Sequence, residues 1–270
     1  MNIEQLKARF RATLAHKYNT SEIDLFLELC CESFDAISRS QLLLNPEIDV
    51  VSHYNKALER LENGEPIQYI LGETTFYGLS IHVNTSVLIP RPETEELVDW
   101  VVQETSSFNN AKILDIGTGS GCIALALKNS LKQTTVMGCD VSTEALKVAK
   151  QNAVNLNLDV SFCTCNALTE SLPTADIYIS NPPYIAEEER STMDDNVLMF
   201  EPEIALFSKD DPLKFYKTII TLAARNKTLS YFETSEFYIS QLRDWLVNNG
   251  LNFEFRKDVN GKTRMLKVWF

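Results

Sequence analysis

Short strand-like runs alternate with helical stretches from Thr94 to the end of the chain. Such alternation predicts an α/β fold, with a mostly parallel sheet covered by helices on both faces. The C-terminal stretch differs, because two strand-like runs flank Asn260-Gly261, a pair typical of tight turns. We therefore expect the last strand to run antiparallel to its neighbour and to close the sheet. The predicted strands are 112–115, 135–140, 159–165, 176–180 and 228–233, and the predicted helices are 95–104, 122–129, 143–156, 212–226 and 235–249.

The chain before this region has a different residue pattern. Up to about residue 62 the apolar residues recur at helical spacing, with Ser21 as a candidate N-cap and Asn63-Gly64 as a helix end. A stretch rich in Gly, Pro, Thr and β-branched residues follows and predicts a β-hairpin. We therefore expect three regions: a small all-helical domain at 1–72, a β-hairpin linker at 73–92 and the α/β domain at 93–270.

Charge and hydropathy exclude several classes of protein. The net charge is −12, and the acidity is spread over both the helical and the α/β regions. A basic stripe that would hold a nucleic-acid backbone is missing from the sequence, which counts against direct nucleic-acid binding. The sequence contains no apolar run of about 18 residues and its N-terminus is amphipathic, so we expect neither a membrane span nor a signal peptide. These features predict a cytoplasmic protein, and we expect a monomer.

The six cysteines include no C-x-x-C pair. Cys163 and Cys165 lie two residues apart on a predicted strand, and no second pair with zinc-like spacing accompanies them. We expect reduced thiols and no metal site.

A glycine-rich loop follows the first predicted strand of the sheet, in ILDIGTGSGCIALAL. Gly117, Gly119 and Gly121 fall at every second position, whereas a dinucleotide fingerprint would be G-x-G-x-x-G. Asp115 precedes them, and an acidic residue suits a positively charged ligand better than a pyrophosphate. Asp140 ends the next predicted strand, where a carboxylate can accept both hydroxyls of a ribose. The pattern predicts a site for S-adenosylmethionine.

The segment SNPPYI ends another predicted strand. The side-chain oxygen of Asn181 and the carbonyl of Pro182 are two acceptors, and the prolines fix the backbone that holds them. Two aimed acceptors match the two hydrogens of a planar –NH₂ group, and Tyr184 can stack on its flat face. Because such a nitrogen is a poor nucleophile, the predicted chemistry is positioning and electrostatic preorganisation for methyl transfer.

Over nearly its whole length the chain resembles the protein-glutamine methyltransferases that modify peptide-chain release factors, the PrmC or HemK-type family. The matching stretches are PIQYILGETTFYGL, LIPRPETEELV, ILDIGTGSGCIALAL, SNPPYI and FEPEIAL. Asn-Pro-Pro-Tyr alone is shared with DNA and RNA amino-methyltransferases, whereas LIPRPETE and the helical N-terminal part point to this family.

The resemblance implies a Rossmann-like class I methyltransferase sheet that uses S-adenosylmethionine. It implies that the helical domain contacts the release factor, and that the methyl acceptor is the glutamine amide nitrogen of the Gly-Gly-Gln loop in class 1 factors. The implied catalytic residues are Asn181, Pro182 and Tyr184. The implied cofactor-binding residues are Asp115, Gly117, Thr118, Gly119, Ser120, Gly121, Asp140, Asn166, Ala167 and Asn181, and the implied substrate-binding residues are Arg91, Glu93, Asn181, Pro182, Pro183, Tyr184 and Glu201.

The chain departs from the family pattern in three places. Asn166-Ala167 stands where the family usually has Asp and a bulky residue, so an aromatic cover for adenine is missing. ARNKTLS replaces a glycine-rich turn, and YFETSEF replaces the usual motif after the fifth strand, although Glu233 is kept.

Two alternatives remain at this point. One is a methyltransferase for the exocyclic amines of adenine or guanine in nucleic acid, which needs a basic channel and a flipped or unpaired base. The other is a non-catalytic adaptor that keeps the cofactor fold.

Overall fold

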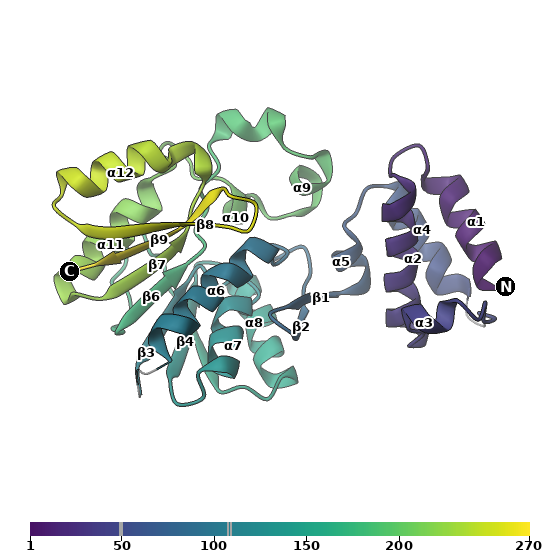
Figure 1. The fold of residues 1–270 in the computed structure, drawn as a ribbon, viewed down its shortest axis with the longest axis horizontal. Coiled ribbons are helices and arrows are strands. Elements are labelled where there is room, and N and C mark those ends of the chain that lie inside the picture. The colour runs from purple at the N-terminus through teal and green to yellow at the C-terminus, as the bar shows by residue number, and fades with distance from the viewer. Residues whose placement is uncertain (49–50, 107, 109) are drawn as a thin grey trace. The chain divides into compact units, whose positions relative to one another are not determined.

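A computed structural model describes residues 1–48, 51–106, 108 and 110–270, and this part of the chain forms two compact units (Figure 1). The helical unit comprises residues 1–72 together with 194–200. The sheet unit comprises residues 73–193 and 201–270, so the hairpin that we predicted as a linker groups with the sheet.

Helix caps and a buried apolar stripe build the helical unit. Asn2 and Asn19 each begin a helix with a capping box, in which the side chain accepts from a backbone N–H three residues later. Our choice of Ser21 as N-cap was wrong, because only Asn19 has a Glu three residues on to complete the box. The core of this unit includes Leu6, Phe10, Leu14, Ile23, Leu27 and Leu61. Its helices are α1 (Ile3–Leu14), α2 (Thr20–Asp35), α3 (Arg39–Leu42), α4 (Val51–Glu62), α5 (Ile67–Leu71) and α9 (Asp195–Phe200).

The sheet unit is built on a seven-stranded sheet in the described part of the chain, with the order β5-β4-β3-β6-β7-β9-β8. The first five strands in this order are parallel, and β9 runs antiparallel to both β7 and β8. This confirms the predicted parallel sheet with an antiparallel last strand, although β8, and not the last strand, forms the edge. The strands are β3 (Lys112–Ile116), β4 (Thr135–Asp140), β5 (Val160–Thr164), β6 (Ile177–Ser180), β7 (Leu229–Glu233), β8 (Asn252–Lys257) and β9 (Thr263–Trp269).

Helices cover both faces of this sheet (Figure 1). One face packs against α6 (Pro92–Thr105), α7 (Cys122–Ser130) and α8 (Thr143–Asn155), and the other against α11 (Lys214–Asn226) and α12 (Ile239–Asn248). The remaining elements of the unit are the hairpin of β1 (Glu73–Phe76) and β2 (Leu79–His82), the short helix α10 (Glu203–Leu206) and the 3-10 helices η1 (Glu187–Thr192) and η2 (Glu236–Tyr238).

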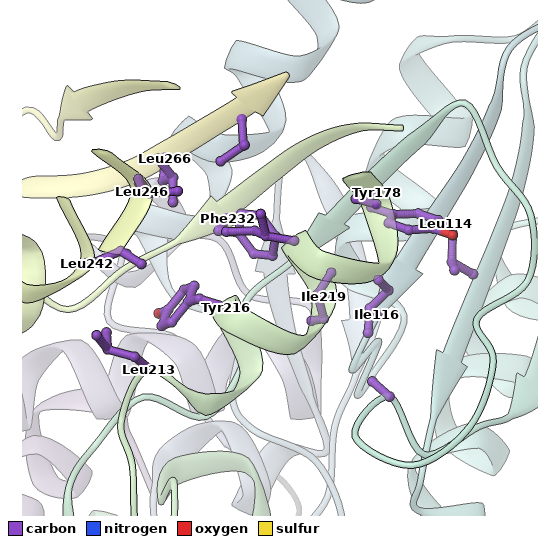
Figure 2. Close-up of a cluster of buried hydrophobic side chains, with 14 of the residues drawn as sticks. Leu114, Ile116, Tyr178, Leu213, Tyr216, Ile219, Phe232, Leu242, Leu246 and Leu266 are labelled. Atoms are coloured by element: carbon purple, nitrogen blue, oxygen red, sulfur yellow. The ribbon is translucent and has the colours of Figure 1, made fainter. Parts of the chain in front are cut away.

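The alternation of side chains along each strand decides which residues face which helices. Figure 2 shows Leu114 and Ile116 of β3, together with Tyr178 and Phe232, in a core cluster with residues of α11 and α12. Since successive strand residues point to opposite faces, Asp115 points toward α7. Its carboxylate accepts a hydrogen bond from the Ala124 N–H at 3.3 Å. The sequence thus places a carboxylate under the helix that follows the glycine loop.

The turn before β7 uses a lysine in a conformation that favours glycine. Lys227 ends α11 with φ +55°, and its N–H bonds to the carbonyls of Ala223 and Ala224. This residue explains how ARNKTLS makes the turn without glycine: the chain accepts a left-handed lysine.

None of the described helices has the length and apolar character needed to cross a membrane.

Candidate active site

A cavity of about 900 Å³ opens where the carboxyl ends of β3, β4, β5 and β6 meet. In a sheet of this topology, ligands bind in the crevice outside these strand ends. The cavity brings together residues that the sequence analysis had assigned to cofactor and substrate. They are Arg91, Gly117, Thr118, Gly119, Ser120, Asp140, Asn166, Ala167, Asn181, Pro182 and Pro183. The described lining does not include Glu93, Asp115, Gly121, Tyr184 or Glu201.

The glycine loop can turn sharply after β3 because its glycines take left-handed conformations. Gly117, Gly119 and Gly121 have φ values of +73°, +54° and +81°. A Cβ at Gly121 would lie 3.1 Å from the Ala149 side chain of α8, so glycine also permits close packing there. Gly138 of β4, which the sequence analysis did not single out, has a similar role, since a Cβ there would lie 2.7 Å from Thr118 Oγ1.

The structure places Asp115 beneath the loop and not in the cavity, contrary to our expectation. Its side chain is fully buried, and Oδ2 accepts hydrogen bonds from Thr118 Oγ1 at 2.5 Å and from the Ala124 N–H. Oδ1 has no hydrogen-bond partner among the described residues. Burial raises the pKa of Asp115 to about 7, and the two hydrogen bonds oppose this rise. Asp115 therefore supports the glycine loop through Thr118.

Asp140 stands at the tip of β4 with both carboxylate oxygens engaged by backbone. Oδ2 accepts from the Gly119 N–H and Oδ1 from the Ser142 N–H, each at 2.9 Å. Burial raises the pKa of Asp140, and these N–H groups oppose it. Each oxygen keeps a further lone pair on the cavity side. The carboxylate can therefore accept two vicinal hydroxyls, such as those of the ribose in S-adenosylmethionine, while it holds the glycine loop.

The segment after β6 is anchored to residues far away in the sequence. Asn181 Nδ2 donates to Thr94 Oγ1 of α6 at 3.2 Å, and Thr94 Oγ1 donates to Glu233 Oε2 at 2.6 Å. Tyr184 donates its hydroxyl to Glu233 Oε1 at 3.2 Å, and its ring packs against the α11 and α12 core cluster. We had expected this ring to stack on the acceptor group, but its position gives it an anchoring role.

Arg91 and Glu201 form an ion pair at the edge of the cavity. Arg91 Nη2 lies 2.6 Å from Glu201 Oε1, and the Ile89 N–H donates to Glu201 Oε2 at 3.2 Å. Glu201 is 5% exposed, so its carboxylate acts through Arg91, which lines the cavity. Glu93 lies outside the lining in the first turn of α6, where its charge raises the pKa of Glu233.

The departure at Asn166-Ala167 leaves a usable polar group. Asn166 Oδ1 accepts from the Leu168 N–H at 3.0 Å, so the amide oxygen stabilises the local turn and the amide nitrogen is left as a donor. Leu168 and Phe215 also line the cavity and supply apolar surface near this position.

Sequence reasoning missed Thr94, Leu168 and Phe215 as lining residues, and it gave Glu233 no role. Thr94 lies inside the LIPRPETE stretch. That stretch indicated that the region belongs to the site, but it did not indicate a role for the Thr94 side chain. Leu168 directly follows Asn166-Ala167, whereas Phe215 and Glu233 come close to the site only through the fold.

Strand order, glycine loop, acidic strand tip and Asn-Pro-Pro-Tyr segment define a class I S-adenosylmethionine-dependent methyltransferase. Two family models match the chain: the Methyltransferase small domain over residues 94–201 and the PrmC N-terminal domain over residues 5–72.

Similar proteins identify the family within this class of methyltransferases. A release factor glutamine methyltransferase of Flavobacterium psychrophilum is 42% identical over 284 residues, covering 100% of both chains. One of Bacteroides thetaiotaomicron is 36% identical and covers 98% of this chain and 99% of its own. The chain belongs to the family of release factor glutamine methyltransferases. This confirms the resemblance on which the sequence analysis relied.

Solved structures show the same fold at low identity. The hMettl16 catalytic domain, in complex with MAT2A 3'UTR hairpin 6, superposes with a TM-score of 0.59 at 18% identity, over 80% of each chain. The N-terminal domain of human METTL16 in complex with SAH gives a TM-score of 0.51 at 20% identity, over 72% of this chain and 76% of that chain.

Proposed function

We propose that this protein transfers the methyl group of S-adenosylmethionine to the side-chain amide nitrogen of the glutamine in the Gly-Gly-Gln loop of class 1 peptide chain release factors. The observation that carries the proposal is the position of Asn181 and Pro182. Both line the cavity beside the glycine loop and Asp140. Relatives that match over their full length are named for this modification.

The residues of the cavity fit S-adenosylmethionine. Asp140 offers carboxylate lone pairs for the ribose, and Asn166 Nδ2 is a donor for the adenine. Gly117 and Gly119, which are exposed or half-buried, present backbone to the rest of the cofactor. When bound, the cofactor supplies an electrophilic methyl group on a sulfonium.

The chain's own contribution is to hold the acceptor amide. Asn181 Oδ1 and the Pro182 carbonyl accept the two N–H groups of the glutamine, and the φ restriction of Pro182 and Pro183 keeps these acceptors fixed. Hydrogen bonds to both N–H groups place negative potential where the nitrogen develops positive charge during methyl transfer. Arg91 lines the entrance and is held by Glu201. Tyr184 and Glu93 act from outside the lining.

We assign contact with the release factor to the helical region at 1–72 and linkage to the hairpin at 73–92. The protein acts in the cytoplasm as a monomer, with a protein substrate and without direct nucleic-acid contact. The net charge of −12 supports a protein substrate over a polyanion.

Methyl transfer from labelled cofactor to a purified class 1 release factor tests the proposal. We expect label on the wild-type factor and none on a factor whose loop glutamine is replaced by alanine. Label that persists on the alanine variant would overturn the proposed acceptor. If RNA or DNA became labelled and the release factor did not, the nucleic-acid alternative would replace the proposal.

A further inference from the structure

A buried carboxylate lies behind the segment that holds the acceptor. Glu233 ends β7 and is 2% exposed. Its Oε2 accepts from Thr94 Oγ1 at 2.6 Å, and its Oε1 accepts from the Tyr184 hydroxyl at 3.2 Å. Thr94 belongs to α6 and Tyr184 to the segment after β6, so one carboxylate engages both elements that meet at Asn181.

The chemistry of these groups fixes the direction of each hydrogen bond. When Glu233 is ionised it can only accept, so the single hydroxyl proton of Thr94 is committed to the bond from Thr94 Oγ1 to Glu233 Oε2. Thr94 Oγ1 can then only accept from Asn181, and the amide must turn its Nδ2 toward Thr94, at 3.2 Å. Since the two polar atoms of a carboxamide lie on opposite branches of a planar group, Oδ1 is the atom left for a ligand.

We propose that Glu233 and Thr94 are positioning residues that orient the Asn181 carboxamide, so that its oxygen and not its nitrogen meets the N–H of the methyl acceptor. This inference rests on the proposed function and deepens it. With the amide reversed, the Asn181 NH₂ would face the NH₂ of the acceptor, and two donors would oppose each other. Proline stiffness fixes where Asn181 lies, whereas the hydrogen-bond chain fixes which of its atoms points to the substrate.

Glu233 is shielded from solvent, and its neighbours act on its pKa in both directions. Burial raises the pKa of Glu233, while the hydrogen bonds from Thr94 and Tyr184 oppose the rise. Arg264 of β9 lowers this pKa and Glu93 of α6 raises it. A buried carboxylate lowers stability unless it is well paired, so an acidic residue with a purely packing role would be a poor choice here.

Thr94→Val tests the proposal, because valine keeps the shape of threonine and removes the hydroxyl. We expect kcat for the release factor to fall roughly tenfold to a hundredfold, with the Kd for S-adenosylmethionine unchanged. Thr94→Ser, which keeps the hydroxyl, restores most of the rate. The matched control is Thr105→Val on the same helix. Thr105 is also buried, and among the described residues its hydroxyl donates only to the Val101 carbonyl, at 2.6 Å.

Glu233→Gln provides a second, independent variant in case Thr94→Val fails to fold. A glutamine amide can donate to Thr94, which frees the Thr94 proton to donate to Asn181 and reverses the amide. We expect a similar loss of kcat. The Thr94→Val/Glu233→Gln double variant should be no slower than the slower single variant, because both substitutions break the same series of hydrogen bonds to Asn181.

The outcomes separate this inference from the function on which it rests. A wild-type protein that does not methylate the release factor overturns the proposed function, and the positioning role with it. An active wild type with Thr94→Val as fast as Thr105→Val overturns the positioning role alone. The same holds if the Thr94→Val and Glu233→Gln losses multiply in the double variant.

Discussion

Asp140→Asn is the sharpest test of the cofactor site. The carboxylate accepts backbone N–H groups and can also accept the ribose hydroxyls, and an amide cannot do both. Each oxygen of Asp140 accepts a backbone N–H at 2.9 Å, one from Gly119 and one from Ser142. Asparagine has one acceptor oxygen, so its NH₂ must face one of these N–H donors. The NH₂ also cannot accept a ribose hydroxyl, so the cofactor loses one hydrogen bond to a charged group, which amounts to about 1.5–3 kcal/mol. At about 1.4 kcal/mol per factor of ten, we expect the affinity for S-adenosylmethionine to fall roughly tenfold to a hundredfold.

Isothermal titration calorimetry with S-adenosylmethionine measures this change directly. The fold should survive, because burial disfavours the charged form of Asp140 and the substitution removes that charge. The matched control is Asp159→Asn, an exposed aspartate at the residue before β5, which should bind like the wild type. An Asp140→Asn protein with an unchanged melting temperature and an affinity within about threefold of the wild type would refute the role of Asp140.

Three further variants test the roles of Asn181, Lys227 and Asp115. Asn181→Ala should lower kcat far more than it weakens cofactor binding, as kinetics and calorimetry would show; equal losses would mean that its role is misassigned. Lys227→Gly should raise the free energy of unfolding by about 1 kcal/mol in urea denaturation, because it relieves a left-handed φ of +55°; an unchanged or lower value would contradict this. Asp115→Asn tests whether burial raises the pKa of Asp115 in the folded protein. The folded pKa of about 7 lies above the usual value of about 4, so the folded state holds a proton that the unfolded chain releases, and wild-type stability falls as pH rises through this window. The stability of Asp115→Asn relative to the wild type should therefore increase between about pH 4 and 7, by a few kcal/mol at most, and a pH-independent difference would exclude the shift.

The sequence predicted the sheet well because its signals are local. Strand-helix alternation and the Asn260-Gly261 turn are readable over a few residues. The helix start at Asn19 was misplaced by two residues, because Ser21 is also a good cap by residue type. Capping depended on which residue has a glutamate three positions later.

The site was predictable where it lies at strand ends and not where it depends on long-range pairing. Asp140 and Asn181 line the cavity because the carboxyl ends of parallel strands meet. The Thr94–Glu233 hydrogen bond joins residues 139 positions apart, and nothing local in the sequence pairs them. Asp115 was misread for the opposite reason: its place in the motif suggested a ligand contact, but strand alternation points it beneath α7.

We propose that Asn181 and its neighbours present one glutamine amide for methylation. Mass spectrometry of a class 1 release factor, after incubation with this protein and S-adenosylmethionine, tests it most directly. We expect a mass increase of one methyl group that fragmentation places on the glutamine of the Gly-Gly-Gln loop, and no increase with Asn181→Ala. A methyl group on any other residue, or an unmodified factor with the folded wild-type protein, would contradict it.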